Sequence, residues 1–200
     1  MKIHIKLLLI AAIFLIIPSV LKSQDCFNRY DLLFENGGDT LNYEDFHKRE
    51  LQFLEDLNGC NAIDFSVQSL DGEEVILSSF KGKIVVLNFW FTTCLPCLKE
   101  IPELNKLTEL YDRDEVVFIA LARDEPEKLD AFFKRFGEFK YIILPESHEI
   151  ASQYNVVGWP QSMVIDKSGR IYKSWAGLHH SAVQQAIEIQ KAIDKCLIQT

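Results

Sequence analysis

The segment NFWFTTCLPCLKEIPEL, residues 88–104, holds two cysteines, Cys94 and Cys97, that are separated by two residues. The apolar run at 83–91 has the length of a strand buried on both faces, and the pattern at 95–110 predicts a helix. Cys94 is therefore expected at a helix N-terminus, where free backbone N–H groups and the helix dipole stabilise a thiolate. Its sulfur should be exposed, should have a lowered pKa and should act as a nucleophile.

A cysteine pair with this spacing belongs to a zinc site, to a structural disulfide or to a dithiol that cycles between two redox states. A zinc site needs two more ligands, yet the other cysteines are single and the histidines lack finger spacing. A structural disulfide would leave a reactive sulfur unused. A cycling dithiol fits best, because Pro96 presets the first helical turn and Cys97 can attack a mixed disulfide on Cys94. No metal site is expected.

Short strands and helices alternate along the chain from residue 65 onward. The predicted elements are a hairpin turning at Asp71-Gly72, strands at 115–122, 141–144, 161–166 and 170–177, and helices at 43–57, 126–137, 147–156 and 180–197. This order predicts an α/β fold with a central mixed β-sheet that is flanked by helices on both faces.

Residues 1–23 have the layout of a secretory signal peptide, in which Lys2 and Lys6 precede an unbroken apolar run at 7–17. That run is shorter than the ~20 residues of a membrane span. The alternative is an uncleaved anchor. Either way, the rest of the chain is expected outside the cytoplasm, in the periplasm or cell envelope, with residues 24–58 as a helical appendage.

The composition is that of a folded globular protein, with 48% hydrophobic and 25% charged residues. The net charge is −8, and loss of residues 1–23 with their three lysines would make it about −11. No stripe of basic residues is visible. The chain is therefore expected to bind no nucleic acid and to contact a membrane only through its N-terminal segment.

The chain resembles the thioredoxin superfamily and, within it, the extracytoplasmic TlpA/ResA-like thiol–disulfide oxidoreductases, which are related to the AhpC/TSA proteins. The resemblance covers about residues 61–195 and rests on DFSVQSLDGEEVILSSFKGKIVVLNFW, on CLPCLKEIPEL and on YNVVGWPQSMVIDKSGRI. It implies a thioredoxin fold over residues 59–200, with an N-terminal hairpin extension and an inserted helix. The redox-active Cys94–Cys97 disulfide would be the reactive group, with no other cofactor.

The resemblance also implies roles for single residues. Cys94 would be the attacking thiol and Cys97 the resolving thiol. Pro160 matches the family's cis-proline, which faces the cysteine pair, and the backbone of Trp159 before it would pair with a substrate strand.

A buried acid that thioredoxins commonly carry is absent, because Asn88 occupies its place. Glu100, three residues after Cys97, becomes the candidate that moves the proton of Cys97. The alternative is a solvated carboxylate in the first turns of the helix.

Two positions depart from the family pattern. Thr93 stands where a tryptophan usually precedes the first cysteine, and Trp159 stands where a small or β-branched residue usually precedes the cis-proline. We expect Thr93, Pro96, Trp159 and Pro160 to contact the substrate. Trp159 is hypothesised to shield the side of the site left open at Thr93. The alternative is a tryptophan that packs as an ordinary surface residue.

The dipeptide Leu95-Pro96 carries no histidine, which in strong oxidants adds positive charge beside the sulfur. Reduction potentials range from about −270 mV for thioredoxin to about −120 mV for DsbA. With Glu100 nearby, the pair should lie toward the reducing end. A reductase in an oxidising compartment needs a membrane thiol donor, and its substrates would be disulfide-containing envelope proteins, apocytochrome c among them.

The other three cysteines are candidates for a structural disulfide. Cys26 and Cys60 are the favoured pair in an oxidising compartment, and Cys60 with Cys196 is the alternative. His179 and His180 are expected as solvated residues at the start of the last helix.

Three competing functions can be compared with the sequence. A peroxiredoxin needs Thr or Ser three residues before its cysteine and Pro seven before it, where this chain has Phe91 and Leu87. A copper chaperone of the Sco type would separate its cysteines by three residues and add a distant histidine. A pure binding module would follow if the dithiol were buried.

Overall fold

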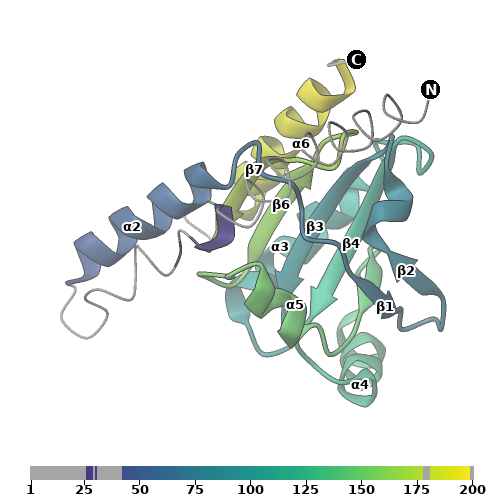
Figure 1. Cartoon of the computed structure of the whole chain (residues 1–200). Helices are drawn as coiled ribbons and strands as arrows, with labels where there is room; N and C mark the ends of the chain where they lie inside the picture. Colours follow the sequence, from purple (N-terminus) through teal and green to yellow (C-terminus); the bar gives the residue numbers. More distant parts are fainter. Residues whose placement is uncertain (1–25, 29, 31–41, 178–180, 199–200) are drawn as a thin grey trace, which may run out of the picture.

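A five-stranded mixed β-sheet forms the centre of the molecule (Figure 1). The computed structural model describes residues 26–28, 30, 42–177 and 181–198. The strands of the sheet are β3 (Ile84–Trp90), β4 (Val116–Ala122), β5 (Ile142–Leu144), β6 (Gln161–Ile165) and β7 (Ile171–Ala176). Their order is β5-β4-β3-β6-β7, with β3, β4 and β5 parallel and with β6 and β7 in antiparallel pairings. The predicted mixed sheet is confirmed.

Helices cover both faces of this sheet, as predicted (Figure 1). One face packs against α3 (Leu95–Leu107), α4 (Pro126–Phe136) and α6 (Ala182–Ile198), and the other against α5 (His148–Gln153) and the end of α2 (Tyr43–Asp56). A hairpin of β1 (Ser66–Gln68) and β2 (Glu74–Ile76) and a short 3-10 helix, η1 (Leu77–Phe80), precede β3. The hairpin turns at Gly72, whose φ of 87° suits a residue without a Cβ.

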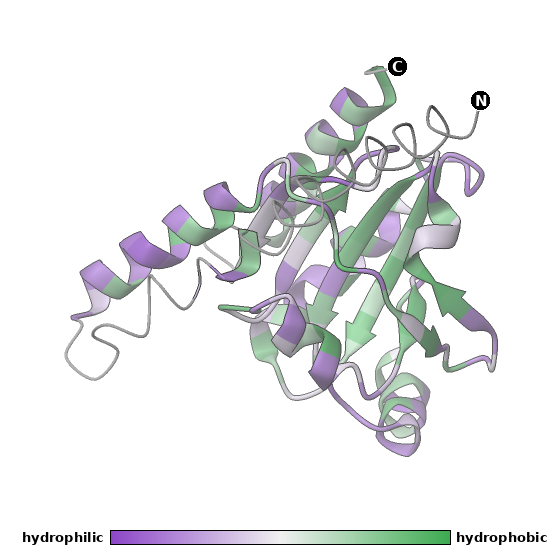
Figure 2. Ribbon diagram, viewed as in Figure 1, coloured by the Kyte–Doolittle hydropathy of each residue, from purple (hydrophilic) through white to green (hydrophobic). Residues whose placement is uncertain are grey.

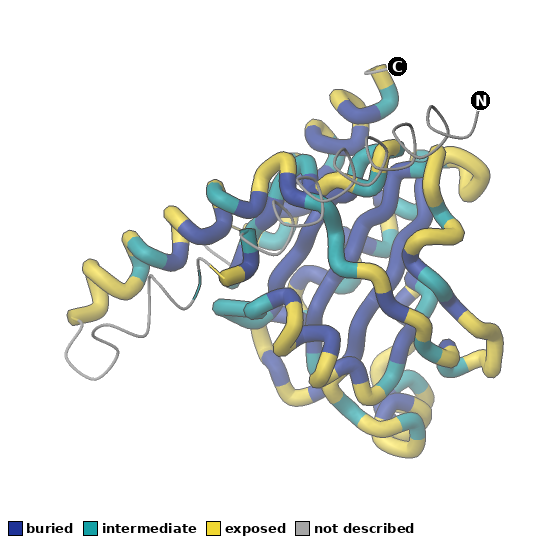
Figure 3. The backbone as a smooth tube through the Cα atoms, in the orientation of Figure 1, coloured by how far each residue is buried: buried dark blue, intermediate teal, exposed yellow. Residues whose placement is uncertain are grey.

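The side chains of β3 divide between the two faces, because successive strand residues point in opposite directions. Val86 and Trp90 pack toward α3, α4 and α6, whereas Leu87 and Phe89 pack toward α2 and α5. Strands β3 and β4 are largely apolar (Figure 2) and buried along their length (Figure 3). Each such side chain contributes about 1.5–3 kcal/mol on burial. Asn88 is the buried polar exception in β3, so it requires polar partners.

Three helix ends differ from the predicted ones. Helix α3 ends three residues early, at Leu107. Helix α5 spans six residues only, because Asn155 adopts a left-handed φ of 47° and turns the chain. Helix α6 begins after Ser181, whose Oγ accepts a hydrogen bond of 3.2 Å from the Gln184 N–H.

Two sequence predictions fall on parts of the chain outside the described residues. These are the signal peptide or anchor at 1–23 and the solvated histidines His179 and His180. Within the described ranges, no helix combines the length and apolar character that crossing a membrane requires.

The appendage before the sheet is tied to the main body by a disulfide between Cys26 and Cys60. The alternative pairing of Cys60 with Cys196 is not formed. Cys196 is a buried residue of α6 with a free thiol, and burial raises its pKa to about 11. The Phe27 ring meets the Tyr154 ring edge-on at 5.5 Å, so the disulfide holds an additional aromatic layer against the α5 face of the sheet.

Candidate active site

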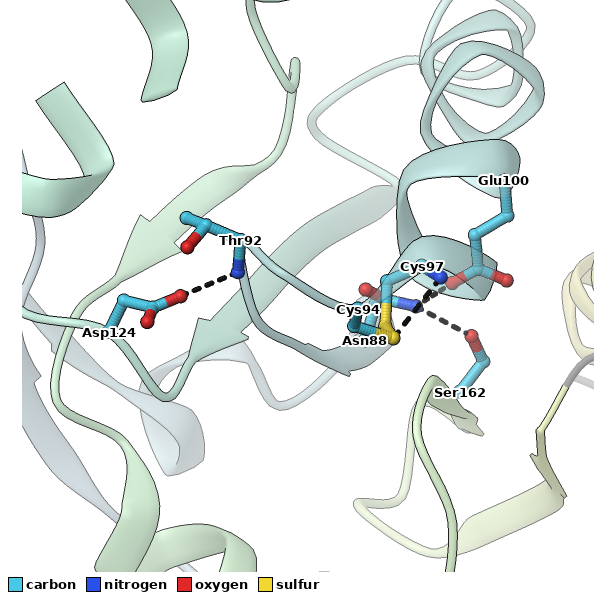
Figure 4. Close-up of a disulfide and its surroundings, with 7 residues drawn as sticks. All are labelled: Asn88, Thr92, Cys94, Cys97, Glu100, Asp124 and Ser162. Carbon is cyan, nitrogen blue, oxygen red and sulfur yellow. Dashed lines mark hydrogen bonds between the residues drawn. A yellow bond between two sulfur atoms is a disulfide. The ribbon is translucent and has the colours of Figure 1, made fainter. Parts of the chain in front are cut away.

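The cysteine pair lies where the central strand passes into α3 (Figure 4). Cys94 is the residue that caps the helix N-terminus, and its Sγ forms a disulfide with Cys97. The Cys97 backbone N–H donates a hydrogen bond to Cys94 Sγ over 3.3 Å. The same N–H would stabilise a Cys94 thiolate after reduction, as expected for a sulfur at a helix start.

The expectation of an exposed sulfur is wrong for this oxidised form. The Cys94 residue is only 4% exposed and Cys97 is 0% exposed. Both lie within the core cluster between α3 and the sheet, and Phe91 and Trp159 pack against that cluster. The exposed residues next to the cysteines are two predicted substrate contacts, Thr93 and Pro96, and the residue between the two motif positions, Leu95. Leu95 is 70% exposed.

Glu100 lies one turn below Cys97 on α3 and is buried, so the alternative of a solvated carboxylate is wrong. The residue is 1% exposed. Its Oε1 accepts a hydrogen bond of 2.7 Å from Asn88 Nδ2 (Figure 4). Asn88 Nδ2 also donates to Ser162 Oγ over 3.0 Å. The asparagine at the position of the missing acid thus holds a buried carboxyl, that of Glu100, by a hydrogen bond.

Burial controls the protonation of this carboxyl. It raises the pKa of Glu100 to about 7, although the hydrogen bond from Asn88 acts in the opposite direction. Within the described part of the chain, Glu100 Oε2, Asn88 Oδ1 and the Tyr141 hydroxyl have no hydrogen-bond partner. Burial, and then the nearby Glu100 charge, keep the pKa of Tyr141 well above its usual value. Glu100 is therefore the group here that can gain and lose a proton near neutral pH.

The loop before Cys94 is fixed by a residue that sequence reasoning missed, Asp124. The Thr92 N–H donates to Asp124 Oδ2 over 2.5 Å, and Lys128 forms an ion pair with the same carboxylate. Burial opposes ionisation of Asp124, but the bonds from Lys128 and Thr92 outweigh it and lower its pKa. The sequence did contain a signal for Asp124. It follows β4, and the carboxyl ends of the parallel strands β3 and β4 meet at the same edge of the sheet, so Asp124 could be expected near the residues after β3.

The peptide bond between Trp159 and Pro160 is cis. Gln161 pairs with Phe89 in the sheet, which places Pro160 beside the end of β3 and the loop to the cysteines. The Trp159 ring packs edge-on against the Phe91 ring, with centroids 5.5 Å apart. Within the described ranges, the backbone N–H and C=O of Trp159 form no backbone–backbone hydrogen bond.

The described residues include no group of three His, Cys, Asp or Glu side chains arranged to hold a metal ion. The reactive group that the structure does contain is the disulfide. A C-x-x-C disulfide at the start of the helix after a central strand, with a cis-proline beside it, defines a thiol–disulfide oxidoreductase of the thioredoxin fold. The chain belongs to the AhpC/TSA family, whose family model matches residues 58–174.

Individual relatives agree with this class. The thiol-disulfide oxidoreductase ResA of Geobacillus thermodenitrificans is 35% identical over 120 residues, which cover 60% of this chain and 69% of the relative. The thioredoxin-like protein YneN of Bacillus subtilis is 34% identical over 132 residues, 64% and 75% of the two chains. A solved thiol:disulfide interchange protein of the thioredoxin family from Chlorobium tepidum superposes with a TM-score of 0.57 at 26% identity, over 66% of this chain and 95% of that one. The predicted enzyme class is confirmed.

Proposed function

We propose that this protein reduces disulfides of other proteins outside the cytoplasm, with Cys94 as the attacking thiol and Cys97 as the resolving thiol. The observation that carries the proposal is the arrangement at the start of α3. Cys94 caps the helix, the Cys97 N–H points at its sulfur, and the buried Glu100 lies one turn below.

The reaction begins from the reduced dithiol. The Cys94 thiolate attacks one sulfur of a substrate disulfide, and the other substrate sulfur leaves as a thiolate. Cys97 then loses its proton and attacks Cys94 Sγ, which forms the Cys94–Cys97 disulfide and releases the second substrate thiolate. Two electrons pass to the substrate, and a thiol donor must return them before the next turnover.

Glu100 is the candidate acceptor for the proton of Cys97. Its pKa of about 7 means that a substantial fraction is ionised at neutral pH and available as a base. The carboxyl's hydrogen bond to Asn88 leaves Oε2 unpaired, which provides an oxygen for the proton.

The direction and the compartment follow from two further features. Leu95-Pro96 places no positive charge beside the sulfurs, which favours a reducing potential. The signal-like residues 1–23 and the Cys26–Cys60 disulfide favour an oxidising compartment such as the periplasm or cell envelope. The partners would be disulfide-containing envelope proteins, as substrates, and a membrane thiol donor that re-reduces the enzyme.

The test is equilibration of the mature protein with glutathione buffers, together with insulin reduction. A potential nearer to about −270 mV than to about −120 mV, with insulin turnover, is the expected result. A potential near that of DsbA would contradict the reductase assignment.

The burial of the cysteine pair favours a second candidate function, that of a thiol-binding module without catalytic turnover. Cys94 is 4% exposed and Cys97 is 0% exposed. Failure to reduce insulin, despite a dithiol that small reductants can open, would support this alternative.

A further inference from the structure

A groove of about 360 Å³ lies next to the cis-proline segment. Its lining includes Trp159, Arg123 after β4, His148 and Asn155 from the α5 region, and Tyr30 from the appendage. Of its lining residues, Trp159 is the one with a role assigned above. Its position at the cysteine end of the sheet raises the question of what it binds.

One wall of the groove belongs to the appendage. The Cys26–Cys60 disulfide anchors this segment, and the Asn155 Nδ2 donates a 2.9 Å hydrogen bond to the Phe27 carbonyl oxygen. The Tyr30 ring packs edge-on against Phe53 of α2 at 5.5 Å. The family model begins at residue 58, so this wall is a feature of the chain outside the part shared with the family.

The groove and the proposed substrate position share one residue, Trp159. Trp159 lines the groove, and its backbone is the edge that a substrate strand would join. Its ring also contacts Phe91, three residues before Cys94. Helix α2 of the appendage also lies next to this segment. A Cβ placed on Gly158, the residue before Trp159, would lie 3.1 Å from Glu50 Oε1 of α2. A polypeptide bound along Trp159 would therefore extend into the groove.

The charge of the groove is unlike that of the whole protein. The chain has a net charge of −8, yet the charged side chain among the described lining residues is Arg123, and no carboxylate lines the groove. Arg123 is exposed, and within the described residues its guanidinium forms no ion pair. The adjacent Asp124 is already bound by Lys128 and Thr92. Arg123 therefore remains available to an anionic group.

We propose that this groove binds the residues that flank the reacting cysteine of a substrate protein, and that Arg123 selects an acidic side chain among them. This inference rests on the proposed function, because the occupant is the substrate polypeptide. The appendage then acts as a specificity element that completes the substrate site.

The test compares two disulfide peptides that differ only in carrying Glu or Lys two residues from the reacting cysteine. At low ionic strength, the wild-type protein should show a kcat/KM about two- to fivefold higher for the Glu peptide, the size of an exposed ion pair. Arg123→Glu should reverse the preference. Arg113→Glu is the matched control, since Arg113 precedes β4 and Arg123 follows it, at opposite ends of the strand. It should leave the preference intact.

A second variant, Tyr30→Ala, tests the wall. It should lower kcat/KM for both peptides and leave the rate with a small aromatic disulfide unchanged. Equal use of the two peptides by the wild type, or an unchanged preference in Arg123→Glu, would overturn the groove proposal while the proposed function stands. A rise in all rates in Tyr30→Ala would show that the Tyr30 ring obstructs the groove and does not form a wall for the substrate, which also overturns the groove proposal. If neither the peptides nor the small disulfide are reduced, the proposed function fails too.

Discussion

At the scale of single residues, the buried carboxyl of Glu100 should control how the reaction depends on pH. Because Glu100 must be ionised to accept the Cys97 proton, the rate of mixed-disulfide resolution should rise as pH passes through about 7. Glu100→Gln should lose this rise and should be slower at pH 8 by roughly 10²-fold. Stopped-flow measurements of resolution between pH 5 and 9 provide the check. An unchanged profile in Glu100→Gln would remove Glu100 from the mechanism.

The same carboxyl should make folding stability depend on pH. Its folded pKa of about 7 lies above the ordinary value of 4.5, so the folded state holds this proton more tightly than the unfolded state. The contribution of the protonated carboxyl to the free energy of unfolding is fully present below pH 4.5 and is lost as pH rises through about 7. At pH 8, Glu100→Gln should therefore be more stable than wild type, by up to about 3 kcal/mol at ~1.4 kcal/mol per pKa unit. Urea unfolding at pH 5 and pH 8 measures this, and equal effects at both pH values would contradict it.

Asn88 and Ser162 should act by positioning Glu100. Asn88→Ala removes the donor that lowers the Glu100 pKa, so the inflection of the pH–rate profile should move to higher pH. Ser162→Ala removes the second acceptor that orients the Asn88 amide, so the bond from Asn88 to Glu100 should weaken and the inflection should move in the same direction by a smaller amount. Ser174→Ala is the control, because it removes a buried hydroxyl that hydrogen-bonds the Ser162 carbonyl oxygen and does not contact Asn88. The positioning role fails if Asn88→Ala and Ser162→Ala keep the wild-type inflection, as the control does.

At the scale of elements, the Cys26–Cys60 disulfide should stabilise the appendage and the α5 face. It joins residues 34 apart, and on the chain-entropy model a loop of this size contributes about 4 kcal/mol. Cys26→Ser with Cys60→Ser should lower the free energy of unfolding by about that amount. Denaturant unfolding in a Cys94→Ser/Cys97→Ser background isolates this disulfide. A loss below about 1 kcal/mol would show that the appendage is not held by it.

The elements around the site could be predicted because their signals are local. The apolar run that forms β3 and the proline at the start of α3 can each be recognised from a few consecutive residues. The partners of these elements are not local, since Asn88 meets Ser162 across 74 residues and Thr92 meets Asp124 across 32. These contacts depend on strand order and register, which no short pattern encodes. The burial of Cys94 was missed for the same reason, because the core cluster that encloses it is assembled from elements far apart in the sequence.

At the scale of the whole molecule, the thioredoxin fold and an appendage that lies outside the family-model match meet at the cis-proline segment. The sheet and α3 supply the dithiol and its buried carboxyl. The disulfide-anchored appendage supplies a wall beside Trp159. Chemistry and partner choice would thus reside in different parts of the chain and could be altered separately.

The central claim is that Cys94 attacks and Cys97 resolves. Its most direct test is to incubate reduced Cys97→Ser and Cys94→Ser proteins with a disulfide substrate and to locate any mixed disulfide by mass spectrometry. Both variants should carry the Cys196 substitution to serine, so that no third thiol reacts. The expected result is a stable adduct on Cys94 in Cys97→Ser and almost none in Cys94→Ser. Trapping on Cys97 alone, or in neither variant, would contradict the account.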